Sequence, residues 1–405
     1  MKNKVLSKYE KYLTGYLVLL FLMSVSFLHL KHETGNDSTI SEWLINYTGG
    51  FTKRGIIGQI SIIFSRFFET ELRDTIFYFQ TVMMGSYFVL IYIFLRNFLI
   101  ERVYLLAIFS PIFLLYPVYE VEVLARKEVF VFIFFLLHLF ILINKIQYSK
   151  FSKLITFTVS VLIWEPIIFF LPMWIFIDII TNKKKQDLKF IFKELVYYLP
   201  ALMICTIYIF DPLTKAEHSK MASILKEEFG EICYMSCSLL ISKSTLIQQF
   251  TGNFHAYSFE NIFRYIIIVI IGFAPLFILL NFSKIKNNKN IILKYTNLSL
   301  SNIFLMLLSP VIILFLMGYD WGRWVNISYV MTLLTFLYLY KNKLIVINMI
   351  RLKKHKINSL SLKSYSILFF IYCFTWSQKT VITGDIGSFP LYRALYKLYK
   401  ISFVY

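Results

Sequence analysis

Long apolar stretches alternate with short polar ones along the whole chain. A helix needs about 20 mainly apolar residues to cross the hydrocarbon core of a bilayer, and many of these stretches approach that length. About eleven of them stand out, at residues 12–30, 75–94, 103–119, 129–144, 154–164, 167–180, 195–210, 263–281, 299–318, 325–340 and 364–378. The pattern predicts an all-α, polytopic transmembrane helical bundle with about eleven membrane segments, and a single integral membrane domain over residues 1–405.

Residues 154–180 do not fit a simple crossing. They are apolar almost throughout, and basic residues flank them on both sides, at Lys150 and Lys153 and at 183–185. Because basic residues mark cytoplasmic ends, we expect both ends on one side and a short re-entrant helical hairpin between them, with its tip at 164–166. Each arm would reach only about 18–20 Å into a core of roughly 30 Å. The alternative is one long tilted helix kinked at Pro166.

The composition excludes a soluble protein. Hydrophobic residues make up 58% of the chain and charged residues 16%, and the mean hydropathy is +0.65. In an average soluble domain about 45–50% of the residues are hydrophobic and about 25% are charged. The formal charge of +19 does not indicate a nucleic-acid partner, because Lys and Arg lie in short clusters between the apolar stretches. That distribution is typical of loop charges that set membrane orientation.

The charges also assign a side to each loop. When successive loops are placed on alternate sides, one side holds 25 Lys and Arg and 5 Asp and Glu, a net charge of +20. The other side holds 17 Lys and Arg and 18 Asp and Glu, a net charge of −1. The two net charges sum to the +19 of the whole chain. The basic side, with the N-terminus, is then cytoplasmic. Two long external segments follow. The first external loop, 31–74, contains an apolar stretch at 55–64 that predicts an interfacial helix, and the cap loop, 211–262, predicts a small group of helices.

Charged residues gather at the external ends of the predicted helices, and ionisable groups near membrane depth are usually functional. The first candidate segment contains Gly49, Gly50, Lys53 and Arg54. Glycines let the backbone approach a ligand closely, and two cations beside free N–H groups suit phosphate or pyrophosphate. The alternative is a plain turn whose cations meet lipid headgroups.

Two further segments are candidate substrate-binding sites. Arg126 stands where the fourth membrane segment begins, and its guanidinium can fork onto phosphate oxygens; a snorkelling edge residue is the alternative. Asp320, Trp321, Arg323 and Trp324 share a tight external turn that combines opposite charges with indole surfaces for sugar stacking. An interfacial Trp belt explains the indoles but not the Asp and Arg so close together.

Glu165 is the sharpest catalytic candidate. A carboxyl held in an apolar hairpin tip should have a raised pKa unless a cation faces it, and a raised pKa suits a general base or a proton shuttle. The alternative is a buried Glu that holds two helices together through Arg or Tyr partners.

Neither the cysteines nor a nucleotide-binding motif indicates a further catalytic or cofactor site. Cys233 and Cys237 lie four residues apart in the cap loop, where they either form a disulfide in an oxidising compartment or stay unpaired. We expect no metal site, because no His or carboxylate cluster stands at ligand spacing. No GxxxxGK[ST] or GxGxxG loop is present, so nucleotide hydrolysis has no support and no cofactor is expected.

These segments resemble motifs of bacterial O-antigen and capsule gene-cluster proteins, in particular Wzy-type polysaccharide polymerases. The resemblance covers most of the chain and rests on residues 49–55, 125–128, the Glu-Pro pair at 165–166, and 320–324. It implies a GT-C-like membrane glycosyltransferase of the bacterial inner membrane. Such an enzyme joins undecaprenyl-pyrophosphate-linked oligosaccharide repeat units on the periplasmic face, in O-antigen, capsule or lipopolysaccharide biosynthesis.

The resemblance also implies roles and partners. It assigns pyrophosphate binding to four cations, Lys53, Arg54, Arg126 and Arg323. It assigns the base that activates the acceptor hydroxyl to Glu165 or Asp320. The implied partners are the lipid-linked oligosaccharide, the bilayer and a protein that regulates chain length.

Two other functions compete with this interpretation. One is a GT-C transferase that adds a single sugar from a polyprenyl-phosphate donor, with Asp37 or Glu42 in the first external loop as its catalytic acid. The other is a lipid-linked oligosaccharide flippase or other transporter. Transporters place polar residues near the midplane and often contain inverted repeats, and the sequence suggests neither.

Overall fold

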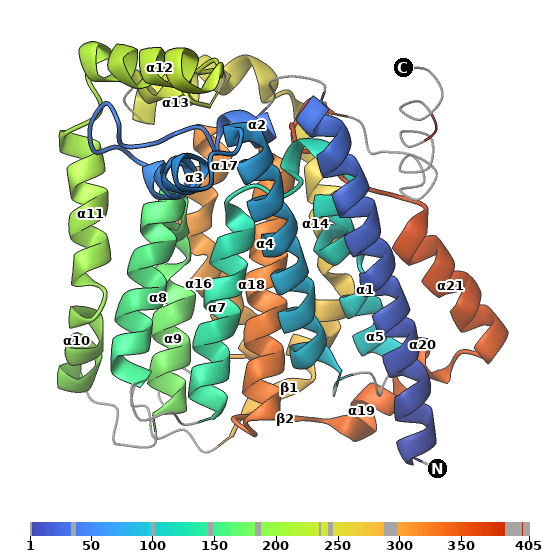
Figure 1. The fold of residues 1–405 in the computed structure, drawn as a ribbon. Helices are drawn as coiled ribbons and strands as arrows, with labels where there is room; N and C mark the ends of the chain where they lie inside the picture. Colours follow the sequence, from blue (N-terminus) through green and yellow to red (C-terminus); the bar gives the residue numbers. More distant parts are fainter. Residues whose placement is uncertain are drawn as a thin grey trace.

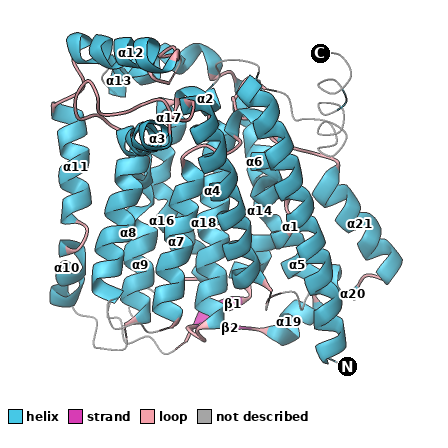
Figure 2. Cartoon of the chain, in the orientation of Figure 1, coloured by secondary structure: helices cyan, strands magenta, loops and turns pink. Residues whose placement is uncertain are grey.

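The computed structural model describes residues 2–33, 38–96, 98, 102–144, 149–182, 188–234, 236–241, 246–286, 298–384 and 399. Helices form nearly all of its regular structure, and the strands within these ranges are two of three residues each (Figure 2). The all-α class expected from the sequence is therefore confirmed, with one small strand pair added.

Five apolar helices in the described residues are long enough to cross a membrane. Three are continuous: α1 (Lys2–Glu33), α4 (Leu72–Leu95) and α14 (Phe259–Asn281). Two are interrupted, over 102–119 and 300–317, and they contain α5 (Arg102–Ile108), α6 (Tyr116–Tyr119), α16 (Leu300–Leu308) and α17 (Ile312–Met317). These helices support a membrane-embedded protein. The larger count of about eleven segments and the GT-C-like architecture stay predictions.

A broken pair of helices gives a sixth candidate crossing. α10 (Leu188–Val196) and α11 (Leu199–Phe210) pass the same test of length and composition together, but they bend by 57° at their junction. Pro200 at the start of α11 lacks the N–H that a continuous helix would need, which favours the break at this point.

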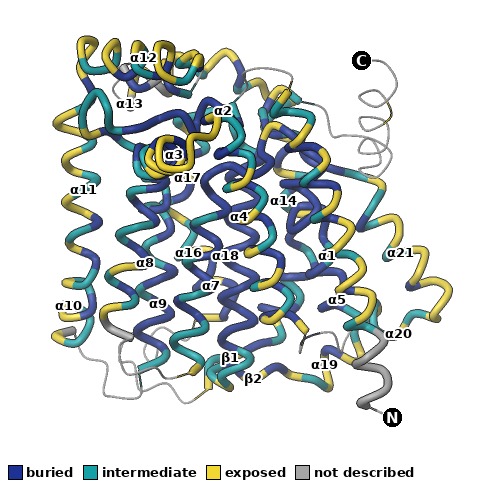
Figure 3. Tube along the Cα trace, in the orientation of Figure 1, coloured by how far each residue is buried: buried dark blue, intermediate teal, exposed yellow. Residues whose placement is uncertain are grey.

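The remaining helices of the bundle run beside these long ones (Figure 1). They are α7 (Glu128–Ile143), α8 (Ser149–Ile163), α9 (Leu171–Thr181), α18 (Trp321–Lys341) and α21 (Leu362–Phe374). α18 lies at the centre, and every residue from Gly322 to Leu339 is buried (Figure 3). α4 instead buries one face and exposes apolar residues such as Val82 and Val89 on the other. An apolar face left open in this way suits contact with lipid.

The apolar segment 154–180 forms two helices with a break between them. α8 ends at Ile163, Trp164 takes an extended backbone, and a 3₁₀ turn from Glu165 to Phe170 leads into α9. The arms have 15 and 11 residues, about 22 and 17 Å at the helical rise. The turn contacts α11, α16 and α17, so its irregular backbone packs against protein, as membrane depth requires.

Short helices cover one end of the bundle, which we call the cap end. They are α2 (Ser38–Ser41), α3 (Gly55–Phe68), α12 (Lys215–Phe229) and α13 (Leu246–Asn253), and α3 and α12 lie across the bundle helices (Figure 1). α3 exposes Phe67 and Phe68, as expected of an interfacial helix. Ion pairs Arg66–Glu228 and Arg73–Glu231 join α12 and the residues after it to α3 and α4.

The opposite end, the strand end, carries the two strands. β1 (Ser283–Ile285) pairs antiparallel with β2 (Ile345–Ile347), and α19 (Met349–Lys354) and α20 (Lys356–Ser359) follow. The Asn- and Lys-rich stretch after α14 has the composition of a solvated loop. Its residues 283–285 nevertheless form a strand, because their N–H and C=O groups find partners on β2, about sixty residues further along the chain.

Candidate functional site

Glu42 lies at the centre of a chain of ion pairs at the cap end. Its side chain is fully buried and accepts hydrogen bonds from Arg54 Nη1 at 3.2 Å and from Arg126 Nε at 3.1 Å. Arg54 also reaches Glu165 with two parallel bonds of 2.8 Å, from Nε and Nη2. The structure therefore brings Arg54, Arg126 and Glu165 together from three separate parts of the chain.

The backbone of Arg54 is fixed as firmly as its side chain. Arg54 caps the N-terminus of α3 in the left-handed conformation, with φ 63° and ψ 8°, and Lys127 Nζ donates to its carbonyl oxygen at 2.5 Å. A Cβ on Gly58, one turn into α3, would lie 2.0 Å from the carbonyl oxygen of Ile45. α3 thus begins at one defined place. Burial lowers the pKa of Lys127 to about 7, although the charge of Glu42 opposes this.

Glu165 faces a cation, so the condition for a raised pKa in the hairpin tip is not met. Its carboxylate joins the hairpin to the start of α3 through Arg54. This is the contact expected of the alternative interpretation, in which a Glu links two segments through an Arg. The general-base role of Glu165 stays a prediction, and it requires Arg54 to move away from the carboxylate.

A second group of charges surrounds Arg323 in the first turn of α18. Nη1 donates to Asp320 at 2.5 Å, and Nη2 forms an ion pair with Glu128, the first residue of α7. The guanidinium carbon lies 5.3 Å from the ring centre of Trp324, whose ring is 5.9 Å from that of Trp164 at the hairpin tip. The turn and the hairpin therefore meet, as a shared site requires.

The two groups act on each other electrostatically. Burial alone would raise the pKa of Glu42, but the charges of Arg126, Arg323 and Arg54 hold it well below its usual range. Burial raises the pKa of Asp320, and Arg126 opposes this only in part. Glu42 is therefore a permanent anion at neutral pH, whereas Asp320 accepts a proton more readily than an ordinary Asp.

A small cavity of about 20 Å³ lies beside Arg323. Its lining comes from α6, α7, α18 and the segment between α6 and α7, and consists of Tyr116, Pro117, Val123, Glu128, Val129, Phe132, Arg323, Asn326 and Ile327. Asn326 Nδ2 donates to the carbonyl oxygens of Ile112 and Phe113, where a π-helical turn interrupts the helix over 102–119. The cavity therefore lies between the charged group and the interior of the bundle.

The glycine pair has a packing partner. A Cβ on Gly49 would lie 2.0 Å from the carbonyl oxygen of Glu217 in α12, and one on Gly50 would lie 3.0 Å from Glu217 Oε1. Close approach of α12 therefore explains both glycines, and the phosphate-cradle interpretation stays a prediction. Lys53, half-buried on the same segment, is close enough for its charge to act on Glu165.

Trp321 and Trp324 have different surroundings. Trp321 packs against the rings of Tyr257, Tyr265 and Phe315, and its Nε1 donates to the Phe315 carbonyl oxygen at 2.8 Å. Trp324 is buried next to Arg323 and Trp164. The described contacts of Trp321 are therefore those of a packed cap residue, while Trp324 borders the charged group.

A second buried polar cluster lies toward the strand end, and sequence reasoning missed it. Asp178 of α9 accepts from Tyr198 OH at 2.6 Å, lies 3.1 Å from His138 Nε2 and lies 3.6 Å from Lys153 Nζ, which also pairs with Glu194. All five side chains are buried. Asp178 and Glu194 lie away from the cap end, and each is paired with Lys153, which is distant from both in the chain.

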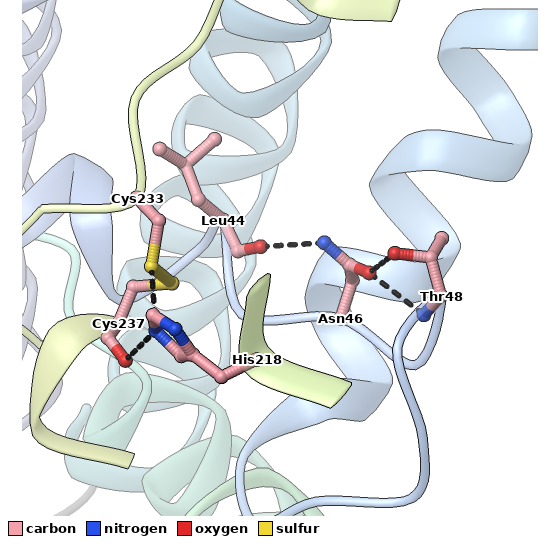
Figure 4. Close-up of a disulfide and its surroundings, with 6 residues drawn as sticks. All are labelled: Leu44, Asn46, Thr48, His218, Cys233 and Cys237. Atoms are coloured by element: carbon pink, nitrogen blue, oxygen red, sulfur yellow. Dashed lines mark hydrogen bonds between the residues drawn. A yellow bond between two sulfur atoms is a disulfide. The ribbon is translucent and has the colours of Figure 1, made fainter. Parts of the chain in front are cut away.

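The cap contains the disulfide that the sequence left open. Cys233 and Cys237 are bonded, and His218 of α12 lies against them (Figure 4). One ligand atom from each of the three residues lies within 4.8 Å of the others. Sequence spacing did not indicate this group, since His218 reaches the cysteines from the separate helix α12. Asp37, the other candidate acid of the first external loop, lies outside the described residues.

No protein-family model, no curated protein and no solved structure matches this chain.

Proposed function

We propose that this protein is a membrane glycosyltransferase that polymerises undecaprenyl-pyrophosphate-linked oligosaccharide repeat units at its cap end, on the periplasmic face of the inner membrane. One observation carries the proposal: three arginines and their carboxylate partners, drawn from the first external loop, the hairpin and the turns before α7 and α18, gather at that end. Ionisable groups collected at membrane depth are expensive to keep and are usually functional.

Pyrophosphate can replace the carboxylates that Arg54 and Arg126 now hold. A guanidinium binds phosphate oxygens with the same two-pronged geometry that it uses for a carboxylate. Lys53 is half-buried on the same segment and supplies a further positive charge where the lipid carrier would arrive. Binding of the donor would therefore draw Arg54 from Glu165 toward the phosphates.

That exchange would activate Glu165. Once Arg54 has moved, the carboxylate at the edge of the apolar hairpin loses the cation that is hydrogen-bonded to it, and its affinity for a proton rises. It can then take the proton of the acceptor hydroxyl, while the hydroxyl oxygen bonds to the anomeric carbon of the donor. The bond from that carbon to the phosphate oxygen breaks, and undecaprenyl pyrophosphate leaves with its charge neutralised by the arginines.

A second candidate rests on Glu42. A fully buried acid in the first external loop, held between Arg54 and Arg126, suits a transferase that adds one sugar from a polyprenyl-phosphate donor. The two candidates differ in their products, since a polymerase makes a ladder of chain lengths and a single-sugar transferase makes one longer product.

The test is reconstitution of the full chain in vesicles with fluorescent lipid-linked repeat units isolated from cells that lack the protein. The wild type should produce a ladder, and Arg54→Ala and Glu165→Gln should each reduce its rate about 100-fold or more. Arg66→Ala is the matched control, because Arg66 lies on the same helix in an exposed ion pair with Glu228.

The other outcomes contradict the proposal. A ladder made at the wild-type rate by both variants would remove the site. One added sugar would favour the second candidate, and translocation of the lipid without new glycosidic bonds would indicate a transporter.

A further inference from the structure

His218 and the cap disulfide form a compact cluster apart from the arginine site. The imidazole points at the disulfide in Figure 4, with Nε2 3.2 Å from Cys233 Sγ and 3.2 Å from the carbonyl oxygen of Cys237. Cys237 is fully buried, and Cys233 and His218 are half-buried. The cluster is therefore largely shielded from solvent but not sealed from it.

Ordered backbone holds both parts of the cluster. The N–H of His218 donates to the Thr214 carbonyl oxygen at 2.9 Å, in a first turn of α12 that a capping box between Thr214 and Glu217 stabilises. The N–H of Cys237 donates to the Tyr234 carbonyl oxygen at 3.0 Å, on the residue next to Cys233. The three side chains are thus arranged in advance.

We propose that the cap binds one Zn²⁺ when its disulfide is reduced, through Nε2 of His218 and the thiolates of Cys233 and Cys237. Zinc prefers these ligand types, with Zn–S and Zn–N bonds of about 2.3 and 2.0 Å that set neighbouring ligand atoms roughly 3.5–3.8 Å apart in a tetrahedron. The three ligand atoms already lie within 4.8 Å of one another. The fourth position is left for water.

The disulfide must be reduced before the cap can bind zinc. An external dithiol transfers two electrons and two protons to the disulfide and becomes a disulfide itself. Zn²⁺ then displaces the two thiol protons, which pass to solvent. The Nε2 proton of His218, which faces the Cys237 carbonyl oxygen, moves through solvent to Nδ1, and the freed lone pair of Nε2 completes the protein ligands. The disulfide closes only its own turn, whereas the metal bonds that turn to α12. This inference does not depend on the proposed glycosyl transfer.

The first test measures zinc stoichiometry on the full chain in detergent. The protein is reduced with a resin-bound dithiol, filtered, and titrated with Zn²⁺ against a colorimetric chelator. The reduced wild type should bind one Zn²⁺, and the unreduced protein should bind at least about 100-fold more weakly because it offers no thiolate. His218→Ala should lose about tenfold or more in affinity, the loss that even an outer partner of a metal ligand causes.

The control replaces the other two cysteines. Cys205→Ser with Cys373→Ser removes the free thiols, which lie in α11 and α21, and should leave zinc binding unchanged. The proposal is overturned by a reduced wild type that binds no stoichiometric zinc, by His218→Ala with wild-type affinity, or by loss of binding in the control.

A spectroscopic readout separates loss of the ligand from loss of the fold. Co²⁺ in place of Zn²⁺ gives a thiolate-to-metal charge-transfer band in the near ultraviolet, and the reduced wild type should show it. Cys233→Ser should weaken the band by about half while the protein elutes from a sizing column as the wild type does. An unchanged band in a variant that elutes normally would exclude Cys233 as a ligand and overturn the site.

Discussion

Arg54 and Glu165 are 111 residues apart in the chain, yet their side chains meet in two parallel hydrogen bonds of 2.8 Å. The contact ties the start of α3 to the tip of the α8–α9 hairpin. Both side chains are about one-fifth exposed, so the pair is reachable from the cap end while it is still shielded from bulk water.

The first prediction concerns the strength of this pair. Arg54→Ala, Glu165→Ala and the double variant form a mutant cycle, and we expect a coupling energy of about 1–3 kcal/mol, because the two side chains interact directly through two hydrogen bonds. Unfolding in mixed micelles measures it. A coupling energy near zero would mean that the two side chains do not interact in the membrane.

The second prediction uses the pH dependence of Lys127. Its folded-state pKa is lowered by burial to about 7, from 10.5. Between these values the unfolded chain holds a proton that the folded protein has released. The free energy of unfolding therefore rises with pH across this window because of Lys127. Below about pH 7 Lys127 no longer makes the free energy of unfolding depend on pH. Relative to Lys127→Met, the wild type should therefore gain stability from pH 7 to pH 10.

Thermal unfolding of both proteins at several pH values checks this. Parallel curves for wild type and Lys127→Met would show that Lys127 keeps its proton in the folded state.

The third prediction concerns the contact between the first external loop and the cap. Gly49→Ala should displace α12, because the added Cβ would lie 2.0 Å from the Glu217 carbonyl oxygen, and overpacking of this kind costs about 1–3 kcal/mol. Hydrogen exchange of α12 should increase. Gly252→Ala is the matched control on α13, since a Cβ there meets nothing within 4 Å. Equal exchange in both variants would contradict the packing.

The fourth prediction tests the buried cluster near the strand end. Lys153→Met leaves Asp178 and Glu194 without their shared cation, and removing one partner of a buried ion pair costs about 3–5 kcal/mol. The yield of folded protein should fall, while the transfer rate per folded molecule should not change. Lys193→Met, an exposed neighbour of Glu194 on α10, should leave the yield unchanged.

A different result would assign the cluster another role. A folded, abundant Lys153→Met protein with a lower transfer rate would connect this cluster to the reaction at the cap end.

Some of this fold could be predicted from the sequence because the signals are local. Apolar length marks α4 and α14, and the lysines on both sides of 154–180 indicate a segment that turns back. The motif at 53–54 and Glu165 were expected to share a site, and their ion pair follows that expectation. These predictions needed only the composition of a stretch and the charges beside it.

The rest depends on partners distant in the chain. Nothing in the residues around Glu42 indicates that it would lie between Arg54 and Arg126. Asp178 looked like a single polar residue in an apolar helix until Lys153 and Tyr198 were placed beside it by packing. The strands β1 and β2 are three residues each, too short for alternation to reveal them.

α18 shows what burial on all sides means for assembly. Although it has 21 residues, it is not among the helices apolar enough to cross a membrane by composition, since it carries residues such as Asn326, Ser328 and Thr332 in its interior. The free energy of such a segment falls only a little when it enters lipid without protein partners. It therefore depends on α7 and α14 to receive it, and variants that weaken those neighbours should be recognised by the cell as insertion failures before any loss of chemistry is seen.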